Sequence, residues 1–224
     1  CDTPLPATQT EPPVSAAPAA APNQAGLGIF NQPIEPQLVE LASDALPIWN
    51  SYKEQKPALV LLSFDPFLAP LPAELEEQSK QLVLTGTPEQ IERQGSFFRA
   101  DNLLLSTQAV SAAISAELFS RIVWVFPAKN PPQALSLDTF REQMVEAKFL
   151  TATEAEQLTL NDATFSGSVR GLPFTAVHYQ AFKKIAEPTL LHIDLSFFDG
   201  LYDSEINTPL YTLLNQTASS LRQS

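Results

Sequence analysis

The sequence contains a single cysteine, Cys1, among its 224 residues. One thiol cannot form a disulfide within the chain, a cysteine-rich zinc site or a CxxCH haem attachment, because each of these needs at least two thiols. We therefore expect no haem and no disulfide framework. Any ligand or metal has to be held by groups other than thiolates.

Glycine, long apolar runs and basic residues are also scarce. Only seven glycines are present, and none of them forms a GxGxxG or P-loop pattern for cradling phosphate. No run approaches the 18 apolar residues that a membrane-spanning helix needs. Against 25 Asp and Glu the chain has 13 Lys and Arg, which gives a formal net charge of −12 and argues against nucleic acid as a partner.

Proline and alanine are abundant in residues 1–36, where only three charged side chains occur and no helical or strand period is visible. Such a segment cannot bury enough apolar area to offset chain entropy. As a Pro-rich spacer it would reach roughly 3 Å per residue, about 100 Å in total. We expect residues 1–36 to act as a tether or as a strap on a protein partner or a second copy, and residues 37–224 to form a single α/β domain.

Cys1, followed by this Pro/Ala-rich segment, resembles the start of a mature bacterial lipoprotein. The resemblance implies that the Cys1 sulfur carries a diacylglyceryl group and that the lipid bilayer is one partner. It also implies a bacterial cell envelope location. We expect the outer membrane or cell surface, with the periplasmic face of the inner membrane as an alternative because of Asp2.

Apolar runs beyond the tail alternate with helical patterns. The continuous apolar run Ala58–Leu62 predicts a fully buried strand, and Arg121–Phe126 and Leu190–Leu195 predict two more strands, the latter buried. Alternation in Thr164–Arg170 and Phe174–His178, on either side of a turn at Gly171–Pro173, predicts a hairpin or a pair of adjacent strands. Helices are predicted from Thr87–Pro88, over Gln108–Leu118, from Asp138 to Phe149, after the capping box Thr151/Glu154, and over Thr208–Leu221. The fold class expected is α/β, three-layered, with a largely parallel sheet and helices on both faces.

Ligands of such folds bind beyond the carboxyl ends of the strands. Three segments follow the inferred strands: SFDPF at 63–67, WVFP at 124–127 and HIDLSFFD at 192–199. Between the first two lies the step DNLL at 101–104. Together they resemble the arginase/deacetylase-like superfamily, in which a DN(F/Y) step, a (Y/V)WV(V)P strand end and an IDLDFF strand end recur.

The superfamily binds one or two divalent metals through D-x-H-x-D after its first strand and S-x-D-x-D-x-x-D after a late strand. Position by position, Ser63, Asp65 and Phe67 stand for the first pattern, and His192, Asp194, Ser196 and Asp199 for the second. Only Asp194 and Asp199 keep the expected type. Asp65, His192, Asp194 and Asp199 could therefore hold at most one weakly bound divalent cation, and we expect a pseudoenzyme without catalytic residues.

Five aromatic residues occur at the inferred strand ends, where they could fill an old cleft or line a binding pocket: Phe64, Phe67, Trp124, Phe197 and Phe198. Three functions follow. The first is a non-catalytic structural or interaction subunit of a surface assembly, with a closed cleft. The second is a metal-dependent hydrolase of C–N bonds, with a polar cleft. The third is a solute- or polymer-binding lipoprotein, with an open cleft and aromatic walls.

Overall fold

The computed structural model of the chain describes residues 36–95, 102–128 and 132–201. All of these lie in the unit Pro36–Ser224. Four predicted features fall outside the described residues: the lipidation site Cys1, the tail to Glu35, Asp101 of the DNLL step and the terminal helix over Thr208–Leu221.

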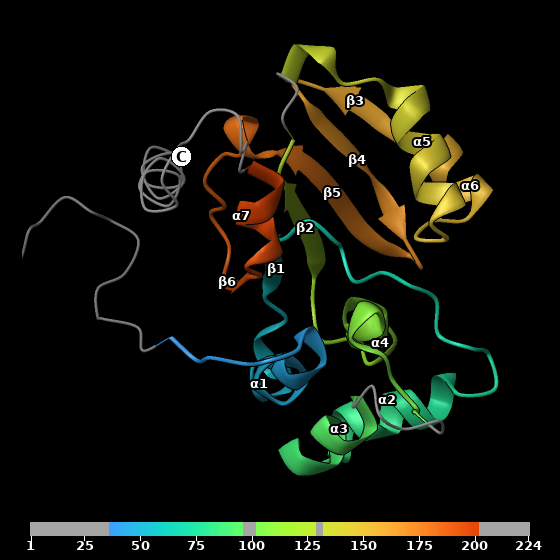
Figure 1. Cartoon of the computed structure of the whole chain (residues 1–224), viewed down its shortest axis with the longest axis vertical. Coiled ribbons are helices and arrows are strands. Elements are labelled where there is room, and N and C mark those ends of the chain that lie inside the picture. Colours follow the sequence, from blue (N-terminus) through green and yellow to red (C-terminus); the bar gives the residue numbers. More distant parts are fainter. Residues whose placement is uncertain (1–35, 96–101, 129–131, 202–224) are drawn as a thin grey trace, which may run out of the picture. The chain divides into compact units, whose positions relative to one another are not determined.

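The described strands form one mixed sheet in the order β3-β4-β5-β2-β1-β6 (Figure 1). The strands β6, β1, β2 and β5 run parallel, whereas β3 and β4 are antiparallel to their neighbours. This confirms an α/β fold, with a sheet that is less parallel than predicted. The strands span Ala58–Leu62 (β1), Arg121–Phe126 (β2), Thr159–Asn161 (β3), Thr164–Val169 (β4), Leu172–His178 (β5) and Thr189–Ile193 (β6).

The antiparallel part arises from two tight turns. Arg170 and Gly171 join β4 to β5 and both have positive φ, 47° and 79°. Asp162 and Ala163, with φ of 46° and 57°, join β3 to β4 in the same way. Two central residues at positive φ are the signature of the type I′ hairpin, whose twist matches that of paired strands. The predicted hairpin is thus confirmed, with its turn one residue earlier than expected, and β3 was not predicted.

The helices are α1 (Leu46–Ser51), α2 (Glu76–Thr85), α3 (Pro88–Gly95), α4 (Ala109–Ser115), α5 (Leu137–Glu146), α6 (Ala152–Glu156) and α7 (Ser196–Leu201). The predicted helix start at Thr87 is confirmed, because its hydroxyl accepts the Gln90 N–H and the Gln90 amide oxygen accepts the Thr87 N–H. The predicted capping box Thr151/Glu154 also forms. The start of α5 was assigned wrongly. Its cap is Ser136, whose hydroxyl accepts the Thr139 N–H, and Asp138 lies inside the first turn.

Strand β1 has all five residues buried, because both of its faces are covered. Leu59 and Leu61 belong to the main core with α1, α4 and α5, and Val60 and Leu62 pack with Phe197 and Phe198 of α7. This double burial explains why β1 lacks polar alternation.

Strand β6 lies at the sheet edge and is not the buried strand that its apolar sequence predicts. Its residues alternate between exposed and half-buried, and Leu191 and Ile193 are 51% and 48% exposed. Within the described residues its only strand neighbour is β1. An apolar run therefore cannot distinguish a central strand from an edge strand.

Candidate functional site

The sequence-predicted metal residues lie at the carboxyl ends of β1 and β6. These strands are parallel neighbours, and the Asp194 N–H donates to the Leu62 carbonyl (2.8 Å). Asp65 and Asp194 are close enough for the charge of Asp194 to act on Asp65. Asp199 is exposed in α7. The structure thus brings Asp65, His192 and Asp194 to one edge, as predicted from the order of elements.

The Asp65 carboxylate is engaged in the turn that follows β1. Its Oδ1 accepts the N–H of Phe67 at 2.6 Å, and the Ser63 hydroxyl donates to the Asp65 carbonyl at 2.5 Å. Burial raises the pKa of Asp65; the bond from Phe67 lowers it, and the Asp194 charge raises it further. One carboxylate oxygen is therefore committed to holding the backbone.

Phe67 has a backbone φ of 53°, a conformation that a bulky residue adopts rarely. Its N–H is held by Asp65, and its carbonyl accepts the Val110 N–H of α4 at 3.1 Å. The Phe67 side chain is a buried ring, and its backbone is held by hydrogen bonds on both sides.

Asp194 has a matching structural role after β6. Its Oδ1 accepts the Ser196 N–H at 2.8 Å, and the Ser196 hydroxyl accepts the Phe64 N–H at 3.2 Å. These two bonds connect the end of β6 to the segment after β1. Both aspartates thus hold turns together by the same kind of local bond.

His192 packs between two aromatic rings. Its ring centroid lies 5.4 Å from that of Trp49 and 6.3 Å from that of Phe67, and both pairs are edge to face. Burial lowers the pKa of His192, while the Asp194 carboxylate raises it. The half-buried imidazole is thus held by aromatic packing. In the described part of the chain no set of three His, Cys, Asp or Glu side chains could hold a metal ion.

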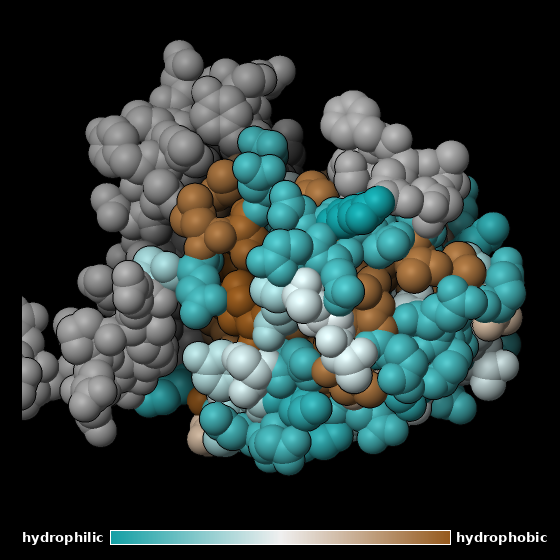
Figure 2. All heavy atoms as spheres, turned by 90° about the horizontal axis from the view of Figure 1, so that it is seen from below, coloured by the Kyte–Doolittle hydropathy of each residue, from teal (hydrophilic) through white to brown (hydrophobic). Residues whose placement is uncertain are grey.

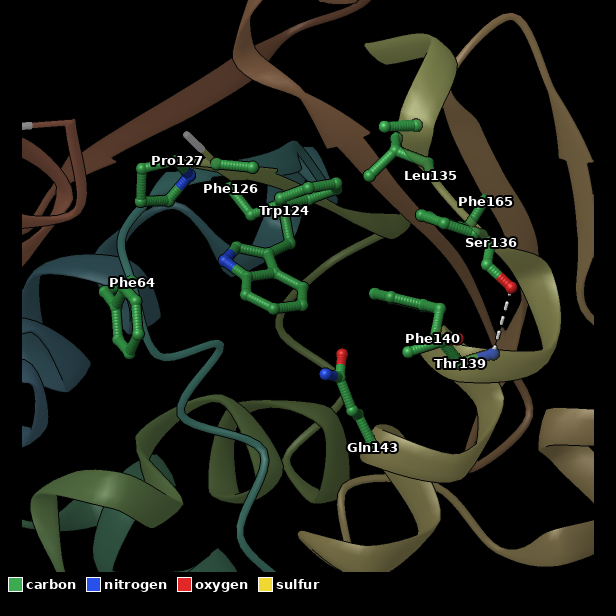
Figure 3. A pocket seen from close by; sticks show the side chains of 12 residues that line it. Phe64, Trp124, Phe126, Pro127, Leu135, Ser136, Thr139, Phe140, Gln143 and Phe165 are labelled. Carbon is green, nitrogen blue, oxygen red and sulfur yellow. Dashed lines mark hydrogen bonds between the residues drawn. The ribbon is translucent and has the colours of Figure 1, made fainter. Parts of the chain in front are cut away.

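A cavity of about 350 Å³ lies beside the carboxyl end of β2, next to the loop that follows β1 (Figure 3). Five aromatic side chains from β2, α5, β4 and the loop after β1 line it: Phe64, Trp124, Phe126, Phe140 and Phe165. We call this cavity the aromatic pocket. Its volume falls in the range typical of small-molecule sites, roughly 300 to 1,000 Å³.

The walls of the aromatic pocket are rigid. Phe140 and Phe165 stack face to face with centroids 3.8 Å apart, and Phe126 lies about equally far from both. The Trp124 indole N–H donates to the Ser63 carbonyl at 3.0 Å, which fixes the ring plane. Phe64 is 63% exposed and lies across Trp124 from these rings (Figure 3).

Polar groups at the aromatic pocket come from α5. Gln143 is exposed, and its amide points toward Trp124 (Figure 3). No hydrogen bond of this amide occurs among the described residues. The Ser136 hydroxyl accepts the Thr139 N–H at 3.3 Å and keeps its own proton free to donate. The pocket therefore offers apolar walls with an amide and a hydroxyl at one side.

The five predicted aromatic residues lie in three different places. Phe64 and Trp124 line the aromatic pocket, whereas Phe197 and Phe198 pack on the opposite face of the sheet, and Phe67 packs on His192. Phe126, Phe140 and Phe165 were missed. The two-residue spacing of Trp124 and Phe126 places both on one face of β2 and could have revealed Phe126; α5 and β4 are distant in sequence and gave no such signal.

Comparisons with known proteins give no further assignment. No family model, no curated protein and no solved structure matches the chain. Within the described residues, none of the helices has the length and apolar character to cross a membrane.

Proposed function

We propose that this domain is a non-catalytic binding module of a bacterial envelope lipoprotein, whose aromatic pocket takes a flat apolar group of a solute or polymer. The observation that carries the proposal is the aromatic pocket itself, with five aromatic side chains around a cavity of about 350 Å³. An apolar ring that buries about 100 Å² there gains roughly 2.5 kcal/mol. The Gln143 amide and the Ser136 hydroxyl would orient a polar substituent of that ring.

Trp124 provides a direct test, because the chain has only two tryptophans. A ring amide carrying a heavy atom, 4-bromobenzamide, should quench Trp124 fluorescence saturably when it enters the aromatic pocket. In a Trp49→Phe background Trp124 is the remaining tryptophan and gives all of the tryptophan emission. This substitution should leave the pocket intact, because Trp49 packs on His192 and does not line the pocket. Absence of saturable quenching in that background would argue against the proposal.

Exposed positions supply variants that keep the fold. Phe64→Ala removes an exposed wall and Gln143→Ala removes the amide, so each should weaken probe binding severalfold. Glu142→Ala is the matched control, because Glu142 is an exposed neighbour on α5 that does not line the pocket. Equal weakening by all three variants would indicate a non-specific effect.

A structural or interaction subunit is the second candidate, favoured by edge strand β6. Leu191, Ile193 and Leu195 are 51%, 48% and 79% exposed, and an apolar edge of this kind suits the addition of an extended apolar segment from a protein partner. Leu191→Lys should abolish such an association and leave probe binding unchanged, which separates the two candidates in one variant.

We also keep the arginase/deacetylase-like descent and its three-layer arrangement as a proposal, supported by the adjacent ends of β1 and β6 where the two motif segments meet. A C–N hydrolase has weaker support. The carboxylates of Asp65 and Asp194 bond to backbone N–H groups, and His192 packs between aromatic rings. Stoichiometric Mn, Fe or Zn bound to these three residues in the purified protein would overturn the proposal that the domain is non-catalytic.

A further inference from the structure

Three lysines gather around a second cavity, of about 290 Å³, near the amino-terminal end of β1. Lys53 and Lys56 come from the 3-10 helix and turn just before β1, and Lys80 comes from α2. Glu54, Glu117, Leu84 and Ala116 complete the lining. We call this cavity the lysine pocket. Three of the chain's 13 basic residues thus converge on one site, in a protein of formal charge −12.

The lysine pocket is built on two turns with unusual backbone. Lys56 has φ 45° and Glu117 has φ 55°, a left-handed conformation that is unfavourable for a residue other than glycine. The Lys56 ammonium donates to the Glu117 carbonyl at 2.6 Å, so that the two turns hold each other in place. The Glu117 carboxylate lies 3.8 Å from the same ammonium. Strain of this kind concentrates at functional sites.

Lys80 has two acidic neighbours on its own helix, yet neither neutralises it. Glu76 and Glu77 lie four and three positions earlier, the spacing at which Glu–Lys pairs normally form. Glu76 Oε1 accepts instead from the Ser115 hydroxyl (3.3 Å), and Glu77 Oε1 accepts from the Gln81 amide (3.0 Å). Among the residues that the structure describes, the Lys80 ammonium has no counter-ion.

Lys53 also lacks a counter-ion among the described residues. Both Lys53 and Lys80 are partly buried, and neither has a hydrogen bond or an ion pair within the described part of the chain. Removing an ammonium from water without a partner is unfavourable. The lining therefore holds three positive charges against two negative ones, a net charge of +1. Lys56 pairs with Glu117, whereas Lys53, Lys80 and the exposed Glu54 have no ion-pair partner among the described residues. In the view from below, much of the described surface is hydrophilic, with hydrophobic patches between (Figure 2).

We propose that the lysine pocket binds a phosphate group. Ammonium groups bind phosphate as compact point charges, and the cavity is larger than phosphate alone needs, with Leu84 and Ala116 as an apolar wall for an attached carbon group. The ligand class is therefore a phosphorylated small molecule or a lipid phosphate headgroup. The site differs from the aromatic pocket in its residues and does not depend on the proposed function.

The test uses the full chain and phosphate probes. Inorganic phosphate and glycerol phosphate should shift the amide NMR signals of Leu84 and Ala116 saturably. Lys53→Gln/Lys80→Gln should raise the Kd at least tenfold, about 1.4 kcal/mol. The control Lys148→Gln/Lys183→Gln removes two lysines outside the pocket and should change the Kd less than twofold.

A gain-of-affinity variant excludes a merely structural effect. Glu117→Gln removes the carboxylate that competes for Lys56, so phosphate should bind more tightly, and added salt should weaken binding less in Lys53→Gln/Lys80→Gln than in the parent. Vesicles with phosphatidic acid, compared with phosphatidylcholine alone, distinguish a lipid headgroup from a free phosphate; binding to either source supports the site. No saturable shift with any of these probes, or equal loss in the control variant, overturns it.

Discussion

The carboxyl ends of β1 and β2 lie side by side in the sheet, yet an aromatic pocket adjoins one and packed turns follow the other. After β1 the chain bonds back on itself through Asp65, and it meets the Asp194 turn after β6. After β2, Phe140 of α5 lies with its ring centroid 6.4 Å from that of Trp124, and both side chains line a cavity. Polar residues at strand ends can thus stabilise turns without forming a binding site. The aromatic pocket forms where a helix that follows β2 in the sequence, α5, contributes a side chain to its wall.

The largest expected effect is a loss of stability when a buried wall residue of the aromatic pocket is removed. Phe165 is fully buried and stacks on Phe140, so Phe165→Ala should reduce the free energy of unfolding by about 3–5 kcal/mol. Phe64→Ala, at an exposed wall, should cost less than about 0.5 kcal/mol. Urea unfolding of both variants measures the contrast; similar losses would mean that Phe64 is part of the core.

A smaller effect tests the turn after β6. Asp194→Ala removes the acceptor of the Ser196 N–H and should cost about 1 kcal/mol, whereas Asp194→Asn keeps an oxygen acceptor and should be nearly neutral. Thermal unfolding of the two variants checks this. A loss in Asp194→Asn as large as in Asp194→Ala would show that the charge matters, as a metal ligand requires.

The packing of His192 predicts a pH dependence. Burial holds the pKa of His192 below its ordinary 6.5, so the unfolded chain takes up this proton at a higher pH than the folded domain. Stability should therefore fall as the pH drops below about 6.5 and level off once the pH passes the folded pKa. Urea unfolding from pH about 7.5 to about 5 should show this slope in the parent and a smaller one in His192→Phe. An unchanged slope in the variant would exclude His192 as its source.

The smallest expected effect is a dependence of stability on pH that is opposite in direction to that of His192. Burial raises the pKa of Asp65, so the protonated form is favoured in the fold, and its stabilisation is lost as the pH rises from 3.8 through the folded pKa. Asp65→Asn keeps an acceptor for the Phe67 N–H and should stabilise the domain slightly at neutral pH, but not at pH about 3. Asp199→Asn, at an exposed position, is the control and should change little.

Local patterns predicted a substantial part of the fold. The strands β1 and β2, the hairpin of β4 and β5, and the caps of α3 and α6 were all predicted from patterns within a few residues. Strand β6 was predicted as buried because it is apolar, and its edge position depends on which strand lies beside it. The cap of α5 was misassigned since Ser136 and Asp138 are both suitable capping residues and only the backbone geometry selects one.

The sequence alone determined the charge balance, the lack of thiol ligands and glycine loops, and the arrival of Asp65, His192 and Asp194 at one sheet edge. Only the tertiary structure decided what those residues do, because their roles depend on bonds to N–H groups and rings of other segments. It also decided where the pockets lie. Phe165 and Trp124 line one cavity, and Lys53 and Lys80 line another, across separations in sequence that no local pattern spans.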